Sequence, residues 1–107
     1  MAEVNHDSKI EELESAHGDV IAFVDNGELF AFKAPSQDVF EEYQIQIADN
    51  DARKKPAAFR VLCRKSCVHG KDQLEDLFKR RPAYPVRIAD QLSKLAGSEL
   101  EFISKKG

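Results

Sequence analysis

The sequence predicts an α+β domain, in which a two-stranded antiparallel β-hairpin packs on a bundle of about four α-helices. Asn26 and Gly27 separate two short runs rich in Val, Ile and Phe, a pattern typical of a hairpin. After Pro35 the apolar residues recur about every 3.6 positions, and later prolines and glycines divide this part into short helical stretches. A chain of 107 residues with 42% apolar side chains suffices for one such domain.

The domain is expected to cover residues 19–97. Residues 1–18 are acidic and lack a wide apolar stripe, so we expect a flexible or weakly helical N-terminal segment of one or two turns. Residues 98–107 are expected to form a C-terminal tail.

The hairpin is predicted by its turn and by the strands on both sides of it. The pair Asn26-Gly27 accepts the positive φ angles of a type I′ turn. Both faces of the two strands carry apolar side chains, and helices must cover at least one face because a lone hairpin is marginally stable. Phe23, Phe30 and Phe32 are candidates for an exposed patch that binds a partner. The alternative is that all three are core residues.

Four helices are expected after the hairpin. The first begins at Ser36, which suits an N-cap, and runs for about 13 residues. The second is expected over 57–69, with Pro56 in its first turn and Gly70 at its end. Its buried face follows helical spacing and comprises Phe59, Leu62, Cys63, Ser66 and Cys67.

The third helix is expected over 72–80, where Asp72 and Glu75 have the spacing of a capping box. Pro82 and Pro85 are expected to end it. The fourth helix is expected to present an apolar face and then a terminal glycine, in the order Val86, Ile88, Ala89, Leu92, Leu95, Ala96 and Gly97.

Charge is segregated along the chain. Residues 1–52 carry 2 basic and 13 acidic side chains, whereas residues 53–87 carry 11 basic and 3 acidic ones. This separation can reflect a nucleic-acid-binding face, internal pairing of the two segments, or head-to-tail association of copies. The candidate residues for a partner or self-association contact are Arg60, Arg64, Lys65, Arg80 and Arg81.

A small nucleic-acid-binding regulator is the alternative function that the basic segment 53–87 suggests. Its side chains could neutralise several phosphates, and the helices at 57–69 and 72–80 could form a helix-turn-helix. However, the whole chain has a net charge of −3, and the first turn of the second of these helices offers only Gln73 for reading base edges. These features disfavour nucleic acid as a partner.

No catalytic pattern occurs in the sequence: a phosphate-binding glycine loop, a nucleophile elbow and an HExxH motif are all absent. Cys63 and Cys67 could share a metal ion from one helix face, but His69 would lie on another side and no fourth ligand is evident. We expect buried, inert thiols, no metal, no cofactor and no enzyme activity. The apolar runs are far shorter than the about 20 residues of a membrane helix, so we expect a cytoplasmic protein without a membrane partner.

Three motifs follow one another along the chain. They are the strands around Asn26-Gly27 leading into "FKAPSQDVFEEY", a helix with Leu62, Cys63 and Cys67, and a last helix "IADQLSKLAG" entered through "RRPAYP". With this order of motifs, about residues 19–97 resemble the tail assembly chaperone family of long-tailed bacteriophages.

The resemblance implies a small, non-catalytic α+β protein without a cofactor. Such a protein would bind the tape measure protein in the bacterial host cytoplasm while tail-tube subunits polymerise around it. Copies of the chaperone would self-associate weakly along that client. Head-to-tail contacts between acidic and basic segments would suit such a row of copies, because a heterologous contact need not close into a ring.

Overall fold

The computed structural model describes residues 6–98 and 103, and it has an α+β fold. Its elements in chain order are α1 (Asp7–His17), β1 (Val20–Asp25), β2 (Glu28–Lys33), α2 (Gln37–Ile47), α3 (Lys54–Ser66), β3 (Cys67–His69), the 3₁₀ turn η1 (Lys71–Gln73), α4 (Leu74–Arg80), α5 (Tyr84–Ser93) and the final turn η2 (Lys94–Ser98). The described residues thus form five α-helices and three strands, where the sequence predicts about four helices and two strands. None of these helices has the length and apolar character needed to span a bilayer.

The predicted β1–β2 hairpin is confirmed. Asn26 and Gly27 have φ angles of 52° and 79°, the two positive values that a type I′ turn requires. Asp25 lies opposite Glu28 beside this turn, and the pairing continues without a shift along all six residues of each strand. The sheet has the order β1-β2-β3, and both strand pairs are antiparallel.

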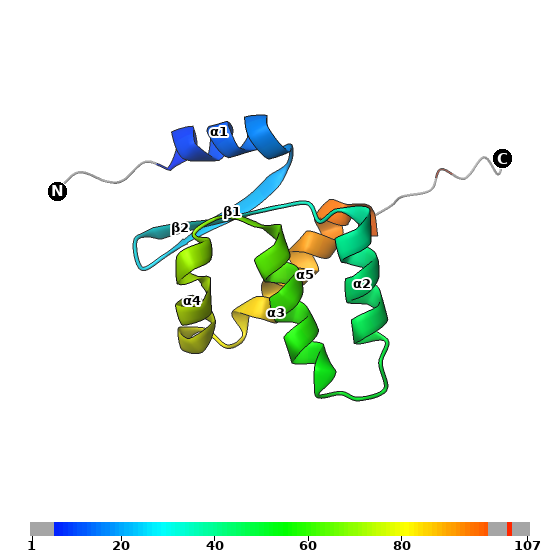
Figure 1. Cartoon of the computed structure of the whole chain (residues 1–107). Helices are drawn as coiled ribbons and strands as arrows, with labels where there is room; N and C mark the ends of the chain where they lie inside the picture. Colours follow the sequence, from blue (N-terminus) through cyan, green and yellow to red (C-terminus); the bar gives the residue numbers. More distant parts are fainter. Residues whose placement is uncertain (1–5, 99–102, 104–107) are drawn as a thin grey trace.

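Helices cover both faces of this sheet. Figure 1 shows α1 on one side of the strands and α2 to α5 on the other. Phe30 and Phe32 belong to the core that the sheet forms with α2 to α5. The alternate residues Leu29 and Ala31 face the other way and are also buried, on the side where α1 packs against β1 and buries Leu13. The second face is therefore packed too, and α1 has about three turns rather than one or two.

The helix expected over 57–69 ends earlier in the structure. It stops at Ser66, and the next three residues form β3, which pairs with β2. Cys67 fits the helical spacing in the sequence, but the free edge of β2 satisfies the backbone groups of Cys67–His69 as a strand. Gly70 therefore follows a strand and not a helix, and its φ of 85° turns the chain into η1.

One of the two predicted helix caps is confirmed. The backbone N–H of Val39 donates to Oγ of Ser36 at 3.4 Å, so Ser36 is the N-cap of α2. The capping box of Asp72 and Glu75 is wrong, because η1 precedes α4 and moves its N-cap position to Gln73, which makes no side-chain hydrogen bond there.

The role predicted for Pro85 is also wrong. It lies in the first turn of α5 instead of ending α4, and a helix tolerates proline there because the first N–H groups lack an intrahelical partner. Val86 is 45% exposed and does not belong to the buried face of α5. The other apolar positions predicted for the first part of α5 are buried, namely Ile88, Ala89 and Leu92, and so are Leu74, Leu77 and Phe78 of α4.

Ser66, at the end of α3, has a fully buried hydroxyl without a hydrogen-bond partner in the described part of the chain. A buried polar group left unpaired costs free energy, so we expect Ser66→Ala to raise the free energy of unfolding by about 1 kcal/mol. Urea denaturation measures this change. Ser93→Ala is the matched control, because Oγ of Ser93 donates to the Ala89 carbonyl at 3.0 Å and its loss should bring no gain. A less stable Ser66→Ala variant would contradict the prediction.

Candidate functional site

An open groove of about 810 Å³ runs between β1 and α5. Its walls come from β1, from the residue before α5 and from α5 itself, namely Ile21, Ala22, Phe23, Val24, Ala83, Tyr84, Arg87, Ile88 and Gln91. Most of these side chains are apolar, Arg87 is the single charged residue among them, and no carboxylate of the described residues lines the groove. The groove therefore offers a surface for binding rather than a set of converging catalytic groups.

β1 borders this groove as an edge strand, with β2 on one side and no strand on the other among the described residues. In a hairpin with a two-residue turn, the residues that flank the turn form a hydrogen-bonded pair, here Asp25 and Glu28. Such pairs alternate along an antiparallel ladder, so the backbone groups of Val20, Ala22 and Val24 point away from β2. In the described structure these outward groups make no hydrogen bond to a turn or loop.

Asp25, the last residue of β1, anchors this strand to the helices. Its carboxylate is 5% exposed and accepts hydrogen bonds from Nη1 of Arg80 at 3.0 Å, Nε of Arg81 at 3.2 Å and the hydroxyl of Tyr84 at 3.1 Å. Arg80, with Arg81 and Tyr84, holds the pKa of Asp25 below its usual value, against the opposing effect of burial. This cluster joins the hairpin turn to the α4–α5 connection and so fixes one end of the groove.

The three phenylalanines proposed as a partner patch have different environments. Phe30 and Phe32 have no exposed surface, so the prediction that they form an exposed patch is wrong and they are core residues. Phe23 is half-buried and lines the groove. Its ring stacks on Phe30 and Phe32 with centroid distances of 5.5 and 6.0 Å, and it meets Tyr84 edge-on at 5.7 Å. The Phe23 ring thus lines the groove and is held in position by the aromatic rings packed against it.

The basic segment is largely neutralised within the chain. Of its 11 basic residues, six form ion pairs within the described part of the chain, namely Arg53, Lys54, Arg64, Lys65, Arg80 and Arg81. All but Arg64 pair with a carboxylate from residues 1–52. Internal pairing therefore accounts for much of the charge segregation. It also weakens the electrostatic case for head-to-tail stacking of copies.

The basic candidates on α3 link this helix to its neighbours. Nζ of Lys65 lies 3.2 Å from Oε2 of Glu42 on α2. Arg64 binds Glu75 of α4 through both Nε and Nη2, and this contact lowers the pKa of Glu75. Arg60 makes no ion pair in the described structure, but its charge also lowers the pKa of Glu75. These exposed pairs orient helices, and each contributes little to stability.

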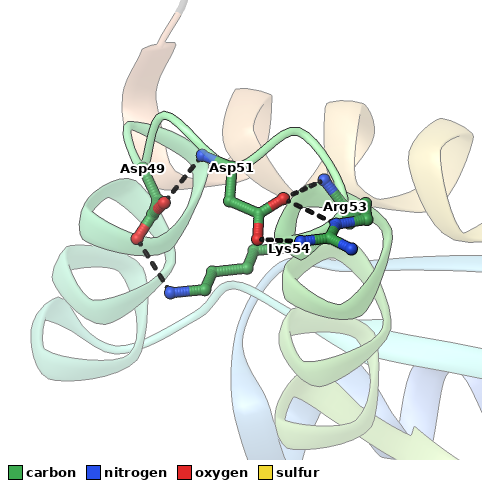
Figure 2. A network of polar contacts seen from close by, with 4 residues as sticks. All are labelled: Asp49, Asp51, Arg53 and Lys54. Atoms are coloured by element: carbon green, nitrogen blue, oxygen red, sulfur yellow. Dashed lines mark hydrogen bonds and ion pairs between the residues drawn. The ribbon is translucent and has the colours of Figure 1, made fainter.

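Two further basic residues, Arg53 at the end of the α2–α3 loop and Lys54 at the start of α3, form a local network with the loop (Figure 2). Oδ1 of Asp49 accepts the N–H of Asp51 at 2.8 Å, and Oδ2 of Asp49 lies 3.2 Å from Nζ of Lys54. Asp51 in turn accepts the N–H and the guanidinium of Arg53 at 3.0 to 3.2 Å. The pKa of Asp49 is lowered mainly by the Asp51 amide and that of Asp51 mainly by Arg53. Arg53 and Lys54, which could otherwise contact a phosphate, are therefore already paired with carboxylates of the α2–α3 loop.

The two cysteines belong to different elements and not to one helix face. Sγ of Cys63 donates to the Pro85 carbonyl at 3.6 Å, and Sγ of Cys67 donates to the His69 carbonyl at 3.2 Å. Burial raises the pKa of Cys63 to about 12 and also raises the pKa of Cys67, so both thiols stay protonated at neutral pH. Over residues 6–98 and 103, the structure contains no group of three or more His, Cys, Asp or Glu side chains able to hold a metal ion.

Apart from Phe23, Arg80 and Arg81, the residues of the groove and of the Asp25 cluster lie outside the predicted set. Asp25 carried a usable signal, since strand alternation places it on the same face as Ile21 and Phe23, which points a carboxylate into the domain. No pattern in the sequence indicates a role for Tyr84 or Arg87, because their role depends on the position of α5 beside a free strand edge.

Comparison with known proteins gives no match to a family model, to a curated protein or to a solved structure. Inference about function therefore rests on the groove, on the Asp25 cluster and on the motifs of the sequence.

Proposed function

We propose that this chain is a non-catalytic assembly chaperone that holds a segment of a phage tape measure protein in the groove between β1 and α5. The observation that carries the proposal is the groove itself, which is open, mostly apolar and bordered by an unpaired strand edge. A polypeptide segment has what such a site requires, namely apolar side chains together with backbone donors and acceptors.

The tape measure protein is proposed as the client because residues 19–97 resemble tail assembly chaperones. A tape measure protein is long and prone to aggregate until tail-tube subunits surround it. One groove per chaperone copy suits this task, because many weak contacts along one chain add up to firm binding. The protein would act in the cytoplasm of the bacterial host, and its own self-association would be weak.

A nucleic-acid-binding regulator has less support than a chaperone. Phosphate binding needs free cations, and six of the 11 basic residues in 53–87 already form ion pairs. The groove also combines a single cation with an apolar lining, whereas nucleic-acid surfaces carry several cations.

The test is co-expression of the full chain with the tape measure protein, followed by co-purification. Val24 lines the groove and is 51% exposed, so Val24→Glu should fold normally and reduce capture about tenfold, the effect of about 1.4 kcal/mol. Ile45→Glu is the matched control, because Ile45 is 73% exposed on α2 and does not line the groove. It should capture the client as the wild type does.

Two results would contradict this proposal. The first is equal capture by wild type and Val24→Glu, which would exclude the groove as the binding site. The second is retardation of duplex DNA by the wild-type chain at low salt, with loss of retardation in Arg60→Glu, which would favour the regulator. If the proposal is correct, the chain leaves DNA unretarded, and the client complex survives 0.5 M NaCl because apolar contacts dominate it.

A further inference from the structure

We infer that the groove takes its occupant as an extended strand: a partner segment that presents apolar and acidic side chains on one face pairs with the outer edge of β1 and becomes a fourth strand of the sheet. This inference rests on the proposed function, since it specifies how the same groove binds and which chemical class of segment it selects.

β1 offers the backbone groups that strand addition requires. Val20, Ala22 and Val24 each point one N–H and one C=O toward the open edge, as their positions relative to the Asp25–Glu28 pair demand. Because β1 has six residues, a partner segment of about six residues would match its length. Main-chain hydrogen bonds of this kind supply affinity without requiring one particular sequence.

β1 also lacks the features by which sheet edges usually avoid extra strands. Protected edges are short, or they carry a proline, a lysine or a bulge. The five residues from Val20 to Val24 are all apolar, and their register with β2 is regular. The opposite edge is different, because β3 has three residues and its register with β2 shifts. An extra strand can therefore pair with the edge at β1 but not with the edge at β3.

The lining of the groove selects the side chains of the added strand. Alternate side chains of that strand would face Phe23, Tyr84 and Ile88, which favour apolar groups. Arg87 lies in the same groove and makes no ion pair in the described structure, and no carboxylate lines the groove. An acidic side chain of the partner would supply the missing countercharge.

The position of α5 favours a lone segment over a second copy of this chain. If two β1 strands paired about a two-fold axis, both α5 helices would lie on one side of the joined sheet. Each would then bring an Arg87 side chain to the same region, without an acid in either groove to balance them. A single partner strand brings no second helix and no second arginine.

The experiment uses the full ¹⁵N-labelled chain and a synthetic probe, the acetylated and amidated hexapeptide Val-Thr-Glu-Thr-Val-Thr. Amide hydrogen exchange should slow at Val20, Ala22 and Val24 when the probe is added. Exchange at Ile21 and Phe23 should change little, because their N–H groups already point toward β2. If amide exchange slows elsewhere but not at Val20, Ala22 and Val24, the inference is wrong.

Modified probes test the backbone contact directly. One probe carries N-methyl groups on residues 1, 3 and 5, and the other carries them on residues 2, 4 and 6. A strand presents alternate amides to its neighbour, so one set should abolish binding while the other keeps it. If both modified probes bind as the unmodified one does, strand addition is wrong.

Protein variants test the two walls. Ala22→Pro removes an outward N–H at a position where edge strands tolerate proline, and it should abolish binding of the probe. Arg87 lies on the exposed side of α5. Arg87→Glu should weaken binding of the glutamate probe about tenfold and strengthen binding of a probe in which lysine replaces the glutamate. Arg60→Glu is the matched control, because Arg60 also makes no ion pair with the residues that the structure describes and does not line the groove. Equal effects of the Arg87 and Arg60 variants would overturn the acidic preference.

The outcomes separate this inference from the proposed function. Capture of the tape measure protein without protection of the three outward amides would reject strand addition and leave the chaperone function standing. Binding of the probe at β1 without capture of that protein would reject the client and leave strand addition standing. Concentration-dependent protection of the same amides without any peptide, with a dimer seen by sedimentation, would make a second copy the occupant and overturn the inference.

Discussion

A Gly70→Ala variant is expected to lose roughly 2–5 kcal/mol of its free energy of unfolding. Gly70 has a φ of 85°, a left-handed conformation in which any Cβ is unfavourable. A Cβ here would lie 2.7 Å from the carbonyl oxygen of Leu29 and 2.8 Å from Cδ1 of Phe30. Both contacts involve β2 and its fully buried ring, so relief would require the sheet or the core to shift.

Urea denaturation of two glycine variants separates the cost of the backbone conformation from the cost of the close contacts. Gly97 has a φ of 102° and a ψ of 19°, a left-handed conformation like that of Gly70, and nothing lies within 4 Å of its Cβ position, so Gly97→Ala carries only the backbone cost of about 1–2 kcal/mol. The difference between the two variants measures how closely the chain after β3 approaches β2. Equal losses would show that this close approach does not occur in solution.

An Asp25→Asn variant is expected to be clearly less stable than the wild type at pH 7, with the difference shrinking as the pH falls to about 3. The folded state lowers the pKa of Asp25, chiefly through Arg80, so ionisation of this group stabilises the fold. That stabilisation is present above the unfolded pKa of about 4 and is lost as the pH falls through the lower folded pKa. Asparagine resembles the protonated acid, so the two proteins converge at low pH.

The measurement is urea unfolding of both proteins at several pH values between 7 and about 3. Asp19→Asn is the matched control, because Asp19 is exposed just before β1 and forms no ion pair in the described structure. It removes the same charge and should change stability little. A stability difference for Asp25→Asn that does not depend on pH would contradict the ionised cluster as its cause. The lowered pKa values of Asp49, Asp51 and Glu75 predict that the wild type itself weakens below about pH 4.

The Asp25 variant also tests whether the cluster supports the groove. Arg80 and Arg81 would lose their carboxylate, and Tyr84, which lines the groove, would lose its hydroxyl contact. A weaker complex with the hexapeptide probe would follow under conditions where the variant remains folded. The cluster acts on binding by positioning the strand and the helix, because its carboxylate does not line the groove.

Local patterns predicted part of this structure correctly. The positive φ angles of Asn26 and Gly27 and the cap at Ser36 depend on the conformational preferences of a few neighbouring residues. The buried positions of α4 and α5 follow from spacing along one helix face. These features need no knowledge of distant parts of the chain.

The failed predictions each involve a competing partner that lies far away in sequence. Cys67 keeps helical spacing but joins β2, whose free edge satisfies its backbone groups. Glu75 fits a capping box but binds Arg64 on α3. Phe30 and Phe32 are predicted as candidates for an exposed patch, but residues of α2 to α5, which follow them in the chain, bury both rings.

Contacts between residues close along the chain set the α+β class, the hairpin with its turn and most apolar positions of the helices, so these features could be predicted from the sequence. The third strand, the pairing of the basic segment with the acidic one, and the groove arise only when distant segments pack together. The free edge of β1, the carboxylate of Asp25 and the wall formed by α5 meet only after folding. Their positions depend on the packing of segments up to about 60 residues apart, which no local pattern encodes.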